Sequence, residues 1–519
     1  MRRAAVFLRD WYRHLPRRAK VAVDIVCVLV LGAAVYWFII TVSGPDTCMR
    51  KGATNVVHDG PAHECVGITD GAFSFDPSLT AVEKKIEHEN TRVTHQHPKN
   101  YVSVVFMLPI SAGSGSTMSM TSAVEQFRGA YVTQYYANRA NVEGATPYIR
   151  LLVGNDGYQG GRQETAVRII TGARAGQHID AVAGLGLSLD STETAVRTLT
   201  AERIPVVGAT LTSDTFDNIK DFIRVSPTNR TDAAAALSFV KSNYTRAVLV
   251  EDQNGRDIFA SSLVEGFERF ADKTHTIVGR QTYDTTPIIE AKTQAEREAA
   301  TEEVENRISL MHTDICDAAP DVSGKHPRTV VLFAGRGREL AELVGALSNA
   351  CLDKHITIIS GDDVTNLPFG PAVRQGLASH VEVYYAGLAN PGEWPTAPAA
   401  PGSVTAQGQR GYTTFHNIYR HVFAEGDHSL TDGNTMVAYD AVLSSVSAIR
   451  LTGRPQPAPY MVAGALGALQ GAHTVLGASG PLRFIADYKT SATGSNPVDK
   501  VIPILRLGPD GTSTFVALK

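Results

Sequence analysis

Apolar and polar residues alternate along most of the chain in a pattern typical of βαβ units. From residue 101 onward, short apolar runs rich in Val and Ile are separated by longer amphipathic stretches. The short runs predict buried strands and the longer stretches predict helices, which together indicate a parallel sheet covered on both faces. The predicted strands of this first series are YVSVVFMLPI, PYIRLLVG, AVAGLG, IPVVGAT and DFIRVSP.

The same pattern starts again after FIRVSPTNR, with RAVLVEDQ, THTIVGRQ, TVVLFAG and ITIISGDD as predicted strands. VEVYYAGLAN, a Pro-rich loop at residues 391–401, two long helices and the closing strand VIPILRLGPDG follow. Two sheets of this kind, with the chain crossing between them several times, predict two lobes with a cleft between them.

The first 43 residues follow a different pattern. Residues 21–43 are apolar except for Asp24, and this length is sufficient to cross a bilayer of about 30 Å. The preceding residues 1–20 carry seven basic residues against the single acid Asp10. The positive-inside rule therefore predicts a cytoplasmic tail at 1–20, a transmembrane helix at 21–43, and an extracytoplasmic location for the rest of the chain.

Two alternatives for this apolar segment are a cleaved signal peptide and a lipoprotein signal. The aromatic residues at positions 36–38 argue against a cleavage site, which requires small residues. Cys27 is preceded by Asp24, Ile25 and Val26 rather than by the Leu and small residues of a lipoprotein signal. An uncleaved signal-anchor is therefore the prediction.

Residues 44–100 are polar and irregular, with one predicted helix at residues 79–90, and we interpret them as an extracytoplasmic stalk. Four cysteines lie outside the predicted membrane span, an even number in an oxidising compartment. Proximity in sequence pairs Cys48 with Cys65 and Cys316 with Cys351. A buried free thiol is the alternative for each of them.

Composition and motifs narrow the function further. Hydrophobic residues make up 43% of the chain, charged residues 19%, and the net charge of −4 offers no basic surface for nucleic acid. The chain has no phosphate-binding P-loop, no H-E-x-x-H zinc motif and no G-x-S-x-G nucleophile turn. We therefore expect a binding protein rather than an enzyme, without a metal or cofactor and without nucleic acid as a partner.

The order of several segments resembles the type I periplasmic binding proteins, in particular the branched-chain amino-acid-binding group of ABC-transporter solute receptors. The resemblance covers about residues 101–514 and implies two doubly wound parallel sheets joined by a hinge. It implies one lobe at 101–226 and 388–482, and another at 227–387 and 483–519. The segments that carry it are AGLGLSLDST, IPVVGATLTSD, FIRVSPTNRTDAAAAL, VLVEDQNGRDIFASSLVEGF, TIISGDD, MVAYDAVLSSVSAIRLTG and SGPLRF.

The ligand-binding candidates follow from this placement, because ligands of such proteins contact the loops at the carboxyl ends of both sheets. Hydroxyls and backbone N–H groups at helix starts suit a carboxylate, and acids in the opposite lobe suit an ammonium. Ser191 is also expected to cap its helix. The candidates are Ser188, Ser191, Thr192, Thr210, Thr212 and Ser213 from the first lobe, and Asp252, Asn254, Arg256 and Asp362 from the second.

Two functions remain in competition at this point. The first is a membrane-anchored solute-binding protein that presents a small polar, amino-acid-like ligand to an ABC permease. The alternative is a receptor ectodomain that signals through a partner membrane protein, with a homodimer formed through one lobe as an expectation of that alternative. A binding fold retained only as a scaffold is a third hypothesis.

Overall fold

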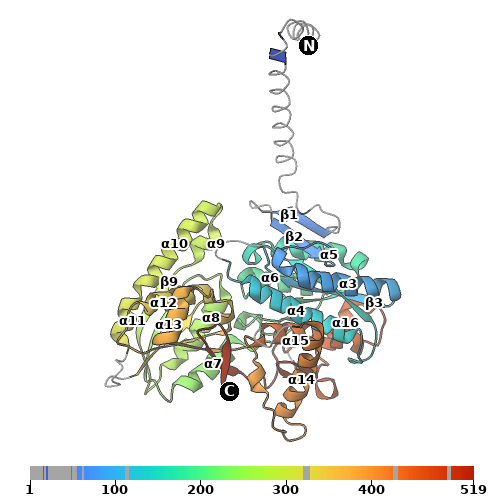
Figure 1. The fold of residues 1–519 in the computed structure, drawn as a ribbon. Helices are drawn as coiled ribbons and strands as arrows, with labels where there is room; N and C mark the ends of the chain where they lie inside the picture. The colour runs from blue at the N-terminus through green and yellow to red at the C-terminus, as the bar shows by residue number, and fades with distance from the viewer. Residues whose placement is uncertain are drawn as a thin grey trace. The chain divides into compact units, whose positions relative to one another are not determined.

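The computed structural model describes residues 16, 19–20, 48, 55–60, 64–111, 116–319, 328–424, 430–487 and 492–519. The chain divides into two compact units, residues 1–50 and residues 51–519, and the second contains both sheets (Figure 1). The predicted transmembrane helix at 21–43 lies outside the described residues. Among the helices that are described, none combines the length and the apolar character needed to span a membrane.

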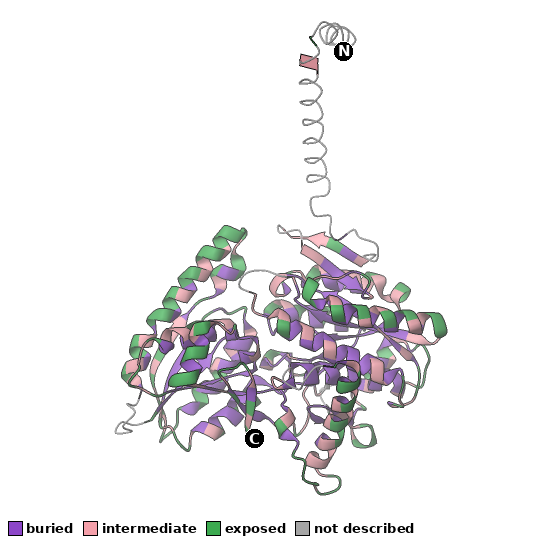
Figure 2. Ribbon diagram, in the orientation of Figure 1, coloured by how far each residue is buried: buried purple, intermediate pink, exposed green. Residues whose placement is uncertain are grey.

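The first sheet has seven strands in the order β1-β2-β4-β3-β5-β6-β7. Strands β3 to β7 run parallel, while β1 and β2 add an antiparallel edge beside β4. The Val- and Ile-rich runs predicted as strands form its centre, where both faces are buried (Figure 2). The bounds are β1 (Asn55–Asp59), β2 (Glu64–Thr69), β3 (Tyr101–Leu108), β4 (Tyr148–Asn155), β5 (Ile179–Gly184), β6 (Val206–Gly208) and β7 (Phe222–Arg224).

Helices from both ends of the second unit cover this sheet. Val104 and Phe106 of β3 share one hydrophobic core with Tyr439 and Leu443 of α15, more than 300 residues later in the chain. We call this sheet with its helices the first lobe. The helices are α3 (Thr80–Gln96), α4 (Met120–Ala137), α5 (Gln163–Gln177), α6 (Asp190–Ala201), α14 (Val404–Val422), α15 (Asn434–Leu451) and α16 (Pro459–Leu466), with the hairpin β13 (Val475–Gly477) and β14 (Gly480–Leu482).

The second sheet has the order β18-β17-β12-β11-β10-β8-β9. Its strands β8 to β12 are parallel, and the last two form an antiparallel hairpin at one edge. The strand predicted to close the chain is thus β17, and one further strand follows it. The bounds are β8 (Arg246–Asp252), β9 (Thr276–Tyr283), β10 (Thr329–Ala334), β11 (Ile356–Ser360), β12 (Val381–Ala386), β17 (Pro503–Leu507) and β18 (Ser513–Leu518).

We call the second sheet and its helices the second lobe. Its cores lie between the sheet and the helices on each face, with Val250 and Phe333 on one side and Leu249 and Leu332 on the other. The helices are α7 (Asn229–Val240), α8 (Ile258–Phe267), α9 (Thr286–Glu290), α10 (Gln294–Leu310), α11 (His312–Ala318), α12 (Gly337–Ser348) and α13 (Pro371–Ser379). Short strands β15 (Ala486–Asp487) and β16 (Ala492–Thr493) lie between β14 and β17.

The interpretation of residues 44–100 as a stalk is wrong for the part that the structure describes. Strand β2 pairs with β4, and helix α3 packs Val82, Ile86 and Val93 into the interior of the first lobe. The polarity of this segment is misleading because some of its polar side chains form hydrogen bonds in the interior of the first lobe. Asn90 donates to the Leu151 carbonyl at 2.7 Å and accepts from the Leu151 N–H at 2.9 Å.

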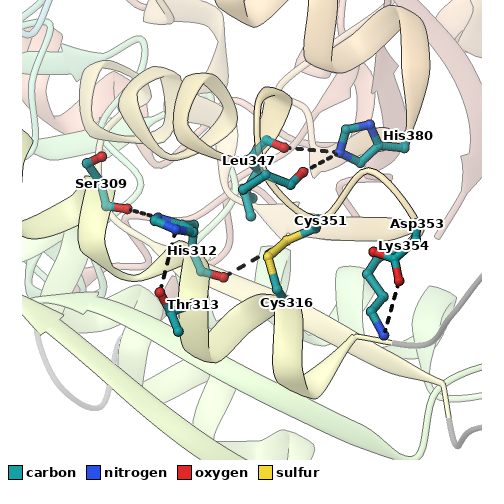
Figure 3. The surroundings of a disulfide bond; sticks show 10 residues. Ser309, His312, Thr313, Cys316, Leu347, Cys351, Asp353, Lys354 and His380 are labelled. Carbon is teal, nitrogen blue, oxygen red and sulfur yellow. Dashed lines mark hydrogen bonds and ion pairs between the residues drawn. A yellow bond between two sulfur atoms is a disulfide. The ribbon is translucent and has the colours of Figure 1, made fainter.

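The predicted Cys316–Cys351 disulfide is confirmed (Figure 3). It joins α11 to the segment after α12, with 5.3 Å between the two Cα atoms. Beside it, the His380 ring lies 3.0 Å from the Leu347 carbonyl at the end of α12. Cys48 and Cys65 are also disulfide-bonded.

Candidate functional site

The loops at the carboxyl ends of the two sheets meet in a polar interface. The Thr212 hydroxyl, which follows β6, donates to Asp362 Oδ1 after β11 at 3.2 Å. The Ser188 carbonyl, which follows β5, accepts from the Phe259 N–H at 3.2 Å and from Arg336 Nη2 at 3.0 Å. Carboxyl ends of parallel strands are where α/β proteins bind ligands, so this interface is the candidate site.

Ser188 organises the first-lobe side of this interface. Its hydroxyl accepts the backbone N–H groups of Thr212 at 3.1 Å and of Ser213 at 3.4 Å, and the residue is 1% exposed. The backbone N–H groups of Thr212 and Ser213 are therefore already hydrogen-bonded within the first lobe.

Arg336 is the central cation of the second-lobe side. Its guanidinium bonds both oxygens of Asp257 at 2.7 Å and Asp363 Oδ1 at 3.2 Å, and it stacks over the Phe259 ring at 4.4 Å. The Arg336 side chain is 5% exposed. Burial alone would lower the pKa of Arg336, but the charges of Asp257 and Asp363 raise it, so the residue is a permanent cation.

Arg336, Asp257 and Asp363 are not among the residues predicted from the sequence. A usable signal was present, because Arg336 comes two residues after the end of β10, at the sheet edge that carries the other candidates.

Asp362 is the acid that faces the first lobe. Its burial and the nearby charge of Asp363 raise the pKa of Asp362 to about 7, although Arg336 acts in the opposite direction. Burial also raises the pKa of Asp363 to about 6. The guanidinium of Arg336 is thus paired with two carboxyls, those of Asp257 and Asp363, and the Asp362 carboxyl beside them is bonded to the Thr212 hydroxyl.

Asp252, Asn254 and Arg256 lie after β8 and have mainly local contacts. Asp252 Oδ1 accepts the N–H groups of Asn254 and Thr285, both at 3.0 Å, and burial raises the pKa of Asp252 to about 7. Asn254 donates to the Thr285 hydroxyl at 3.0 Å. Arg256 is half exposed beside Glu290 at 3.2 Å, and only its backbone carbonyl, which accepts from the Asp190 N–H at 3.1 Å, reaches the first lobe.

The remaining candidates also take part in local contacts. Ser191 does not cap α6, because the helix begins one residue earlier and the Asp190 carboxylate accepts the Ser191 N–H at 2.7 Å. Thr192 accepts from Gln163 Nε2 at 2.8 Å, on the side facing α5. Thr210 donates to the Gly186 carbonyl at 2.5 Å. Ser213 caps the short helix Asp214–Phe216.

The space beside Arg336 is small. A cavity of about 20 Å³ lies between Leu189 of the first lobe and Asp257, Thr285 and Arg336 of the second. This volume holds about one water molecule. At this point of the interface, a solute of amino-acid size can enter only when the two lobes separate.

Known proteins resemble this chain in structure but not detectably in sequence. No family model matches the chain, and no curated protein matches it either. Solved structures do match, with TM-scores above 0.5 over about four fifths of the chain. At identities of 14–15%, these matches establish the fold alone.

Three of the similar structures are substrate-binding proteins of transporters. The branched-chain amino acid transporter protein LivJ from Streptococcus pneumoniae, in complex with isoleucine, is 15% identical, with 81% of this chain and 99% of that chain covered and a TM-score of 0.53. An ABC transporter substrate-binding protein from Desulfitobacterium hafniense, in complex with leucine, is 14% identical, with coverages of 80% and 100% and a TM-score of 0.54.

The third is a solute-binding protein of an ABC transporter from Rhodopseudomonas palustris, in complex with 3,4-dihydroxybenzoic acid. It is 14% identical, with 81% of this chain and 97% of that chain covered and a TM-score of 0.52. The two sheets, the contact between their carboxyl ends and the similar solved structures all indicate the same fold. The chain has the type I periplasmic-binding-protein-like fold.

Proposed function

We propose that the chain is a membrane-anchored, extracytoplasmic solute-binding protein that closes around a small polar ligand and presents it to an ABC transporter. The observation that carries this proposal is the buried polar interface at the carboxyl ends of both sheets, where Thr212 faces Asp362 and Ser188 faces Arg336. The similar structures solved with isoleucine and with leucine support an amino-acid-like ligand.

The charges at the interface favour a ligand with an ammonium group. The carboxyls of Asp257, Asp362 and Asp363 outnumber the guanidinium of Arg336. Asp362 is bonded to a neutral hydroxyl rather than to a cation. A ligand ammonium placed there would gain a charge-assisted hydrogen bond, whereas the guanidinium of Arg336 is already paired with Asp257 and Asp363.

The proposed location rests on the sequence at the N-terminus. The apolar residues 21–43 and the basic residues before them support a single membrane span with the cytoplasm on the N-terminal side. We propose lobe boundaries near residues 226, 387 and 482, with residues 55–100 added to the first lobe. The separate hydrophobic cores of the two lobes support these boundaries. The protein would bind its ligand without changing it chemically.

The test is a thermal-shift and calorimetric screen of the purified full chain against the twenty amino acids. A ligand at a hundred times its dissociation constant adds about 2.7 kcal/mol to stability, so a true ligand raises the melting temperature. We expect Asp362→Asn and Thr212→Val to weaken binding at least tenfold. Thr198→Val, on the exposed face of α6, is the matched control and should bind as the wild type does.

The transport role is tested separately by uptake of the radiolabelled ligand in cells with and without the gene. Loss of uptake in the deletion strain supports presentation to a permease. If an amino acid binds but uptake is unchanged, the sensory alternative replaces transport. If no amino acid binds, the proposed ligand class is wrong.

A further inference from the structure

A cavity of about 890 Å³ lies in the first lobe, away from the interface between the sheets. Its walls come from α4, α14, α15, the β13 strand and the Pro-rich loop of residues 391–401, which the proposed binding function leaves unexplained. The volume falls within the range of small-molecule sites in proteins, about 300–1,000 Å³. The size of this open-mouthed cavity suits a compact organic ligand.

The floor of the cavity is one stripe of α15. Tyr439, Leu443 and Ser447 are spaced four residues apart, so they lie on the same face of the helix, and each is at most 4% exposed. The Tyr439 hydroxyl is buried and has no hydrogen-bond partner among the described residues. A buried hydroxyl without a partner costs roughly as much as a lost hydrogen bond, which makes this group a ready donor to a ligand oxygen.

The rim of the cavity carries a cation. Arg410 lies on the exposed side of α14, and within the described part of the chain its guanidinium has neither an ion-pair nor a hydrogen-bond partner. The acid at the rim, Glu143, is held by His473 at 2.9 Å. The rim therefore offers an unpaired positive charge, while Glu143 has its own partner.

Hydrogen bonds within the first lobe hold the walls in place. Gln409 Nε2 bonds the Ala397 carbonyl at 2.8 Å and also the Pro395 carbonyl, which fixes the Pro-rich loop against α14. Arg450 donates to the Val142 carbonyl at 3.1 Å and so fixes the segment after α4. A cavity with fixed walls loses little conformational entropy when a ligand enters.

We propose that this cavity binds a small organic acid with an apolar, aromatic body. The carboxylate pairs with Arg410 at the rim, and the body lies against Tyr136, Leu443 and Val475. An oxygen at the inner end accepts from the Tyr439 hydroxyl. Since every lining residue belongs to the first lobe, this site is independent of the ligand proposed for the interface between the lobes.

The experiment is isothermal titration of the purified full chain with 3-(4-hydroxyphenyl)propanoate, with 3-phenylpropanoate, and with the amide of the first compound. We expect the hydroxylated acid to bind at one site per chain and the amide to bind at least tenfold more weakly. Arg410→Ala should weaken binding of both acids at least tenfold. Arg454→Ala removes an exposed arginine elsewhere in the first lobe and should leave both affinities unchanged.

Tyr439→Phe separates the role of the hydroxyl from that of the ring. The variant should melt at a higher temperature than the wild type without ligand, bind the hydroxylated acid about tenfold more weakly, and bind 3-phenylpropanoate equally well. Thr413→Trp, an exposed wall residue, should block both acids by filling the cavity. Absence of binding at millimolar concentrations, or affinities unchanged by Arg410→Ala and Tyr439→Phe, would overturn the proposal, as would loss of binding in Thr212→Val.

Discussion

Asp156, directly after β4, is a carboxyl whose burial makes stability depend on pH. It is fully buried, neither of its oxygens has a hydrogen-bond partner among the described residues, and the neighbouring Gln163 donates to Thr192. Burial raises the pKa of Asp156 from 3.8 to about 7. The folded state therefore holds this proton more tightly than the unfolded state, and the resulting stability is lost as pH rises towards 7.

We expect Asp156→Asn to stabilise the protein at pH 8 and to change it little at pH 4. At pH 8 the Asp156 carboxyl of the folded wild type is ionised although it is buried, which lowers the stability of the protein. Each unit by which the pKa is raised corresponds to about 1.4 kcal/mol of lost stability. The gain should therefore be about 1 kcal/mol or more, measured by urea unfolding at both pH values. The exposed Asp353→Asn is the control, and an equal gain at pH 4 and pH 8 would contradict the argument.

The raised pKa of Asp362 makes ligand affinity depend on pH, as that of Asp156 makes stability depend on pH. Its pKa of about 7 means that the carboxyl is half protonated near neutrality, and an ammonium placed beside it would lower that pKa. Binding should then release a proton, and affinity should rise between pH 6 and pH 8, by up to about tenfold per pH unit below the pKa. Calorimetry in two buffers of different ionisation enthalpy measures the proton, and Asp362→Asn should abolish both effects.

The candidate site could be predicted from the sequence only in part. Thr212 and Asp362 each follow a predicted strand, so the position of each at the carboxyl end of its own sheet is readable from the sequence. Arg336 could not be assigned a role in the same way, because its partners Asp257 and Ser188 come from a different strand and from the other lobe. Which neighbouring polar groups satisfy one another depends on tertiary packing, which no local pattern contains.

At the scale of elements, the parallel strands were predictable because burial on both faces leaves continuous apolar runs, as in β10 and β11. Strands β1 and β2 were not, since they form an antiparallel edge, and β1 in particular is only partly buried. Helix α3 was predicted, but its membership of the first lobe was missed. Its Asn90 donates a hydrogen bond to the backbone of β4. In the sequence alone, a polar residue at this position is typical of an exposed helix face.

The Cys316–Cys351 disulfide gives a prediction about α11 and α12. It closes a segment with a sequence separation of 35 residues, and such cross-links contribute about 2–4 kcal/mol, largely by restricting the unfolded chain. The double variant Cys316→Ala/Cys351→Ala should lose stability in this range. Hydrogen exchange should accelerate in α11 and α12, while α15 of the first lobe serves as the internal control. Equal acceleration in α15 would show that the effect is global.

At the scale of the second unit, the two lobes meet largely through polar contacts, which include the bonds of Ser188 to Phe259 and Arg336. The Ser119 N–H donates to Asn366 Oδ1 at 3.2 Å, and the Thr212 hydroxyl donates to Asp362 at the same distance. Individual hydrogen bonds of this kind contribute only about 0.5–1.5 kcal/mol each. The hydrophobic cores, in contrast, lie mainly within each lobe, and Ile258 of α8 is a second-lobe side chain that packs against a first-lobe core. The lobes are therefore built to keep their own structure while the interface between them opens.

This arrangement predicts that Thr212→Val combined with Asn366→Ala shifts the ligand-free protein towards an open form. Single-molecule energy transfer between dyes at Thr194 and Asp353, one exposed position on each lobe, should decrease. A saturating ligand should restore it, because a ligand that binds the closed form shifts the population back. Affinity should fall by the factor by which the closed population falls. The exposed pair Thr198→Val and Asn243→Ala is the control, and an unchanged transfer efficiency in the interface variant would show that other contacts hold the lobes together.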